Sequence, residues 1–170
     1  MRYWVLTGIL LAGFLVQSVL GHFLAIGPAS PNLVLVVVIA FALLFGWQIG
    51  LGAGVLGGLL LDLVASKYVG IRLLALGSAG LMVGLVEERV FKDNLLLGLL
   101  GGFVGSVAGQ AIILSVLWGF GQPISLLDLR QLFYTALYDM LWCLFIYYRL
   151  YKNYRYLHPD PRGTIVLRRQ

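Results

Sequence analysis

Apolar positions run along this chain in stretches longer than any soluble helix or strand. Residues 3–61, 59 in all, contain no Asp, Glu, Lys or Arg and lie between Arg2 and Asp62. Apolar runs separated by breakers and charged loops predict six spans, over residues 3–24, 31–45, 47–65, 71–86, 95–118 and 132–148. A helix needs roughly 20 residues to cross a hydrocarbon core about 30 Å thick, so most of these runs are long enough to do so.

The fold class predicted from this pattern is an all-α membrane protein, a six-transmembrane-helix bundle. The span over 31–45 is rich in β-branched residues, but an open strand in lipid would leave backbone groups unpaired, so a helix is expected. The first span exceeds the apolar core of a signal peptide and is expected to be a retained helix. We therefore predict one transmembrane domain over residues 1–157 and a basic tail over 158–170.

Composition supports the membrane assignment. Hydrophobic residues make up 61% of the chain, charged residues 11%, and the mean hydropathy is +0.95, whereas soluble domains are roughly 25% charged.

The positive net charge of +5 does not indicate binding of nucleic acid, because half of the twelve basic residues follow the last span: Arg149, Lys152, Arg155, Arg162, Arg168 and Arg169. By the positive-inside rule both termini are expected to be cytoplasmic. The tail is expected to attract anionic membrane lipids, with contact to a cytoskeletal filament as the alternative.

Two segments outside the spans carry helix signals. Ser125 and Asp128 stand at capping-box spacing in the loop over 119–132, which predicts a short interfacial helix there. After the last span, "RLYKNYRYLHPDP" alternates basic and aromatic residues and predicts a helix along the headgroups that ends before Pro159.

Five polar residues fall in the outer half of the predicted spans: Asp62, His22, Gln110, Asp139 and Gln17. A carboxylate in lipid costs about 2.5–3.5 kcal/mol on insertion scales, so it normally faces the bundle or a wet cavity and has a partner. Asp62 has two interpretations. It caps a helix or pairs with nearby Lys67 or Arg72, or it belongs to an outward-open polar pocket or partner surface.

The other four polar residues also have both a structural and a ligand-binding interpretation. Asp139 has no Lys or Arg within easy reach, and we expect it to be hydrogen-bonded or protonated. His22, Gln17 and Gln110 are the kind of polar residue that usually satisfies a partner within a bundle. Ligand binding in the outer half is the alternative for each of them.

Glycines recur every fourth residue on one face of the third span, at Gly46, Gly50, Gly54 and Gly58. Small residues at this spacing let helix backbones approach closely. Packing inside the bundle is one interpretation, and docking of a partner's transmembrane helix is the other, with Gly50, Gly54 and Gly58 as its candidate residues. Similar stripes follow the fourth and fifth spans.

Signatures of enzymes and metal sites are missing from the sequence. It contains no HExxH, no Walker A and no GxSG motif, and its one cysteine, Cys143, lies inside the last span. The Tyr138-Asp139 pair alone is half of an aspartyl-protease dyad. We therefore predict a non-enzymatic protein with no catalytic residue, no metal and no cofactor.

The run "SPNLVLVVVIAFAL" (30–43) and the run "GLGAGVLGGLLLDLVASKYVGIRLLAL" (50–76) together resemble MreD, the family of bacterial rod shape-determining membrane proteins. The Pro31-Asn32 start, the glycine ladder and the run ending at Asp62 carry the resemblance, whereas Arg72 and the long tail depart from it. The resemblance implies a scaffold or regulatory subunit of the cell-elongation and peptidoglycan machinery in the bacterial inner membrane. Its implied partners are a single-span MreC-like protein and, through it, MreB, a SEDS glycosyltransferase and a class B penicillin-binding transpeptidase.

The fold of that family is similar to the six-helix S-components of energy-coupling-factor vitamin transporters, and this similarity supplies the alternative function. An S-component would capture a small molecule in an outward-facing pocket, which suits the polar residues of the outer half. Its first span would carry an A-x-x-x-A docking motif, where this chain has Gly8-x-x-x-Ala12. The scaffold role is therefore the prediction, and the S-component is its alternative.

Overall fold

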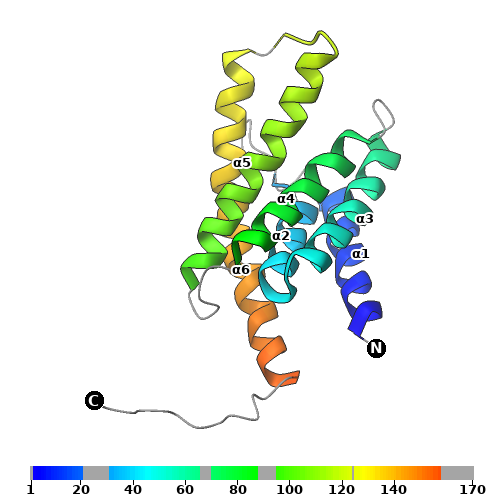
Figure 1. Ribbon diagram of the computed structural model, residues 1–170, viewed down its shortest axis with the longest axis vertical. Coiled ribbons are helices and arrows are strands. Elements are labelled where there is room, and N and C mark those ends of the chain that lie inside the picture. Colours follow the sequence, from blue (N-terminus) through cyan, green and yellow to red (C-terminus); the bar gives the residue numbers. More distant parts are fainter. Residues whose placement is uncertain (1, 21–30, 66–69, 88–94, 124, 158–170) are drawn as a thin grey trace, which may run out of the picture.

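The structure is a computed structural model that describes residues 2–20, 31–65, 70–87, 95–123 and 125–157. Within these ranges it consists of six helices and contains no strand, which confirms the predicted all-α bundle (Figure 1). The helices are α1 (Arg2–Leu20), α2 (Leu33–Phe45), α3 (Trp47–Ala65), α4 (Ile71–Glu87), α5 (Leu95–Gly119) and α6 (Leu126–Leu157). The start of α1 and the end of α6 lie at the same end of the bundle (Figure 1).

Helix α2 forms the centre of the bundle and packs against all five other helices. Eleven of its 13 residues are buried, from Leu33 to Leu43. The β-branched run that resembles a buried strand is thus a buried helix, because side chains from the other helices surround it. At about 1.5 Å per residue α2 is roughly 20 Å long, shorter than a bilayer core. One end of α2 therefore lies inside the bundle, below the level that α5 and α6 reach.

Glycine separates the helices where the backbone needs a conformation that other residues avoid. Gly46 has φ of 86° and joins α2 directly to α3, so these two helices form a tight hairpin. Gly70 has φ of 102° and comes just before α4. The bounds predicted for the spans over 47–65 and 71–86 agree with α3 and α4 to within one residue.

Helices α3 and α4 pack with their backbones almost in contact. A Cβ atom on Gly50 would lie 2.6 Å from the Cβ of Ala42 and 2.8 Å from the carbonyl oxygen of Gly80. A Cβ on Gly54 would overlap the carbonyl of Leu76, and one on Gly58 would overlap the backbone of Leu73. The glycine ladder of the third span thus lies against α2 and α4, inside the bundle.

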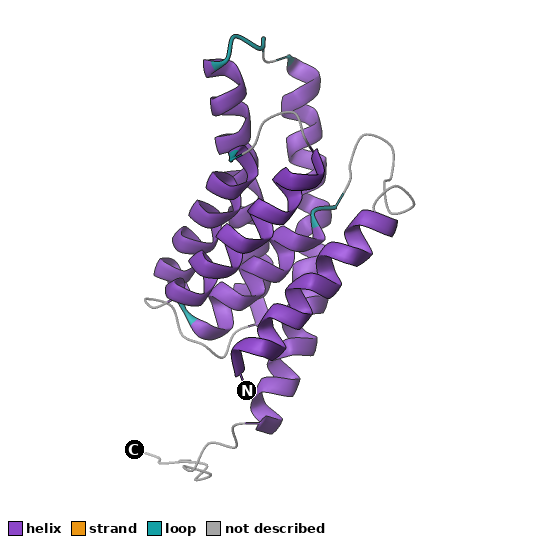
Figure 2. Ribbon diagram, turned by 90° about the vertical axis from the view of Figure 1, so that its right-hand side faces the viewer, coloured by secondary structure: helices purple, strands orange, loops and turns teal. Residues whose placement is uncertain are grey.

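The last helix joins three segments that the pattern predicted separately. Helix α6 runs from Leu126 to Leu157 and includes the short helix predicted within 119–132, the span over 132–148 and the helix predicted before Pro159. The capping box exists: the Ser125 hydroxyl accepts from the backbone N–H of Leu127, and Asp128 accepts from that of Ser125 at 2.9 Å. No breaker follows the box, so the chain continues as one helix. Helices α5 and α6 thus extend beyond the others at the end where they are joined (Figures 1 and 2).

The outside of the bundle carries large apolar side chains, as a protein in lipid requires. Trp4 and Val19 on α1, Leu63 on α3 and Leu141 on α6 are all more than half exposed. Two helices, over Trp47–Val64 and Leu99–Gly119, are long and apolar enough to cross a membrane by themselves, and shorter apolar helices cover Trp4–Val19, Leu33–Phe45 and Ile71–Val86. The tail over 158–170, and with it the predicted domain boundary, lies outside the described residues.

Candidate functional site: a polar pocket above the central helix

The beginning of α2 lies inside the bundle, and side chains from other helices satisfy its first backbone N–H groups. Asp139 of α6 accepts from the N–H of Asn32 at 2.8 Å, and Gln17 of α1 accepts from that of Val34 at 2.9 Å. The Asn32 side chain accepts from the N–H of Leu35 at 3.1 Å. The first N–H groups of a helix have no partner within it, so burial of this end requires such acceptors.

Asp139 also begins a chain of hydrogen bonds that leads away from α2. Its second carboxylate oxygen accepts from the Ser106 hydroxyl of α5 at 2.6 Å, and the same hydroxyl oxygen accepts from Nε2 of Gln110 at 3.0 Å. Asp139 and Ser106 are completely buried. We name Asp139, Ser106 and Gln110 the polar chain. Its hydrogen bonds connect α5 and α6 to the beginning of α2. They also stabilise a buried carboxylate that would be unfavourable in free energy without partners.

Asp62, near the end of α3, is not part of the polar chain and bonds to the backbone at the beginning of α4. It is buried, and its carboxylate accepts from the backbone N–H groups of Gly70 at 2.8 Å, Arg72 at 3.2 Å and Leu73 at 3.0 Å. It therefore caps the beginning of α4 and closes the turn between the two helices. A carboxylate there also has a favourable interaction with the positive end of the helix dipole.

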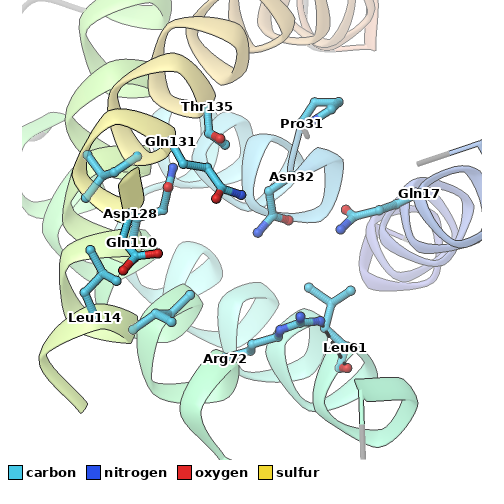
Figure 3. A pocket seen from close by; sticks show the side chains of 12 residues that line it. Gln17, Pro31, Asn32, Leu61, Arg72, Gln110, Leu114, Asp128, Gln131 and Thr135 are labelled. Carbon is cyan, nitrogen blue, oxygen red and sulfur yellow. Dashed lines mark hydrogen bonds between the residues drawn. The ribbon is translucent and has the colours of Figure 1, made fainter. Parts of the chain in front are cut away.

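An open pocket of about 320 Å³ lies above the beginning of α2 and is lined by residues of α1, α3, α4, α5 and α6. Its polar lining combines amides, a hydroxyl and two opposite charges, and its apolar lining is aliphatic: Gln17, Asn32, Arg72, Gln110, Asp128, Gln131 and Thr135, with Pro31, Leu61, Ile113, Leu114 and Leu132. Figure 3 shows Arg72 across the space from Gln131 and Thr135, with Asn32 between them. The volume is at the lower end of the range for small-molecule sites.

The candidate residues from the sequence divide among three places. Gln17 and Gln110 line the pocket, and Asp139 supports it from below through the polar chain. Asp62 does not line the pocket but caps α4 behind Leu61 and Arg72, which do. Gly50, Gly54 and Gly58 lie between helices. His22 lies outside the described residues.

Several residues of the pocket escaped the sequence reasoning. Arg72 and Asp128 stand in the first turn of a helix, and Gln131 and Thr135 lie within the first three turns of α6. A polar residue there is unremarkable by itself, and Asn32 entered only as part of a motif. The signal that could have identified them is their place along the chain. In an antiparallel bundle the beginnings of α2, α4 and α6 lie at the same end as the ends of α1, α3 and α5, so the polar residues near them come together. Among the described residues, no group of three His, Cys, Asp or Glu side chains is placed to hold a metal ion.

Comparison with known proteins matches residues 1–155 to the family model described as ECF-type riboflavin transporter, S component. No curated protein and no solved structure matches the chain.

This match overturns the resemblance to MreD. The predicted scaffold role in cell elongation and peptidoglycan synthesis was wrong, and so were the partners that it implied: MreC, MreB, the SEDS glycosyltransferase and the class B transpeptidase. The physical reason lies in the motif, since its glycines and apolar residues serve helix packing and Asp62 serves a helix cap. Such features belong to the six-helix fold and do not distinguish its functions. The chain belongs to the family of ECF-type riboflavin transporter S components.

Proposed function

We propose that this protein is the substrate-binding subunit of an energy-coupling-factor transporter and that it captures riboflavin, or a close relative of it, in the pocket above α2. It would work without catalysing a reaction and would depend on the energising module of the transporter for release of its ligand. The observation that carries the proposal is the pocket itself: a chamber that is open at one end of the bundle and lined by side chains from five helices in a chain of this family.

The chemistry of the lining suits a flat, neutral, polar ring system. Pro31, Leu61 and Leu114 offer apolar surface, while the amides of Gln17, Asn32 and the other polar residues offer both donors and acceptors. Arg72 and Asp128 balance each other in charge, so the pocket has no strong preference for an anion or a cation. A flavin has an aromatic body, a polar imide edge and a sugar-alcohol chain, and each part has a counterpart in this lining.

We also propose that the pocket opens on the outer face of the cytoplasmic membrane and that both termini are cytoplasmic. The basic residues Arg149 and Lys152 lie at the end of α6 opposite the pocket, as the positive-inside rule requires. This orientation would let the protein take its ligand from outside the cell.

The test is binding of riboflavin by the purified protein in nanodiscs, followed by the quenching of flavin fluorescence. We expect saturable binding, and we expect Gln131→Trp to weaken it at least about tenfold because the larger side chain occupies the pocket. Leu141→Trp is the matched control, since Leu141 lies on the same helix with its side chain 59% exposed on the outside. Absence of riboflavin binding, or binding that Gln131→Trp leaves intact, would refute the proposal.

A further inference from the structure

Hydrogen-bond partners fix the orientation of two amide side chains in the pocket. Backbone N–H groups can only donate, so they must meet the oxygen of an amide and not its nitrogen. The N–H of Val34 is bonded to Oε1 of Gln17, and the N–H of Leu35 is bonded to Oδ1 of Asn32. The NH₂ groups of Gln17 and Asn32 are thus the ends that these side chains offer to a ligand.

Gln110 has the opposite orientation, and the polar chain is the cause. The Ser106 hydroxyl has one proton, which it donates to Asp139, so its oxygen can only accept from Gln110. The NH₂ group of Gln110 therefore faces Ser106, and its carbonyl oxygen is the end left for the pocket. Asp139 and Ser106 are fully buried, so no bulk water competes for these bonds.

We propose that Asp139, acting through Ser106, holds the carbonyl oxygen of Gln110 toward the pocket and so makes the pocket selective for a ligand that donates a hydrogen bond there. Asp139 is a positioning residue in this scheme, since it does not line the pocket itself. The imide N–H of a flavin is a donor of this kind, and it would give its hydrogen bond to the carbonyl oxygen of Gln110. The inference rests on the proposed function, because it uses a flavin as the ligand.

Asp139→Asn is the decisive substitution because it keeps the shape of the side chain and reverses the polar chain. The single oxygen of the new amide still accepts from the N–H of Asn32. Its NH₂ group replaces the oxygen that faces Ser106, so Ser106 now accepts from residue 139 and donates to Gln110. Gln110 then turns its NH₂ group toward the pocket, where it meets the imide N–H of the ligand as a second donor.

A second substitution should restore the acceptor. In the Asp139→Asn background, Gln110→Glu accepts the Ser106 proton with one carboxylate oxygen and offers the other to the imide N–H. In the wild-type background the same Gln110→Glu change places a second carboxylate at Ser106, whose only proton Asp139 already takes. The substitution is therefore expected to be harmful alone and beneficial in combination, with the net charge of the pair unchanged.

The experiment measures riboflavin affinity by fluorescence quenching in nanodiscs for the wild type, the two single variants and the double variant. We expect each single variant to bind about tenfold or more weakly, and the double variant to return to within about threefold of the wild type. N3-methylriboflavin lacks the imide proton, so its affinity should be the same for the wild type and Asp139→Asn. Asp62→Asn is the matched control: it makes the same change at the other buried aspartate and should not alter the preference for riboflavin over N3-methylriboflavin.

The outcomes separate the two proposals. If the wild type does not bind riboflavin, the proposed function fails and the inference fails with it. If the wild type binds but Asp139→Asn binds equally well, or the double variant shows no recovery, the inference alone is overturned. Should Asp139→Asn not fold, Ser106→Ala replaces it: a folded Ser106→Ala protein with wild-type preference for riboflavin over its N3-methyl derivative would overturn the inference.

Discussion

Asp62 shows how one buried side chain can hold two helices in place. It receives three backbone N–H groups from the turn before α4 and the first residues of that helix. Sequence reasoning anticipated both a helix cap and a pocket residue but offered no way to choose, because the choice depends on where the chain returns after the segment between the two predicted spans, whose course the pattern leaves undefined. The aspartate at the end of the long uncharged stretch is thus a structural anchor.

Asp62→Ala should lower the stability of the protein. Loss of a cap costs about 0.5–2 kcal/mol, and each buried N–H left without an acceptor adds about 1–3 kcal/mol, so we expect at least about 2 kcal/mol in total. The measurement is the thermal unfolding of the ligand-free protein in detergent. Asp128→Ala is the control, since Asp128 is only half-buried and caps α6 through one backbone N–H. Equal unfolding temperatures for both variants would contradict this account of Asp62.

At the scale of helices, the sequence was most informative where a glycine or proline marks a boundary. Gly46 and Gly70 delimit α3 and α4, and Pro31-Asn32 precedes α2, so these helices fell close to their predicted bounds. The start of α6 was misplaced because hydropathy detects the part of a helix that lies in lipid, and α6 continues beyond it. The pocket was only partly predictable, since Gln17 and Gln110 stand out inside apolar spans whereas Arg72 and Gln131 do not.

Two glycines of α3 allow a direct test of the close packing against α4. Gly54→Ala adds a Cβ that overlaps the carbonyl of Leu76, whereas Gly52→Ala adds one with no atom within 4 Å. Overpacking costs about 1–3 kcal/mol, and alanine otherwise gains up to about 1 kcal/mol over glycine within a helix. Thermal unfolding should therefore show a destabilised Gly54→Ala protein and an unchanged or stabilised Gly52→Ala protein. Two variants with the same stability would refute the proposed contact.

The helical bundle has two different ends. The pocket lies at one end, and α1 begins and α6 ends at the other. The proposed orientation can be tested with single cysteines, because the one natural cysteine, Cys143, is buried and can be replaced by alanine. Gln122 and Lys152 are exposed at opposite ends of the bundle. A membrane-impermeant maleimide should label Gln122→Cys in intact cells, and should label Lys152→Cys only after the cells are lysed. The reverse pattern would place the pocket on the cytoplasmic side.

The capping of α2 by Asp139 implies an order of biosynthesis. The bond from the Asn32 N–H to Asp139 joins residues 107 positions apart, and its acceptor lies on α6, the last of the described helices. Helix α2 is made second, yet one of its first N–H groups finds its acceptor only on α6, after the other five described helices. The floor of the pocket is therefore incomplete until α6 has been synthesised and packed, so a chain that stops before α6 would lack it.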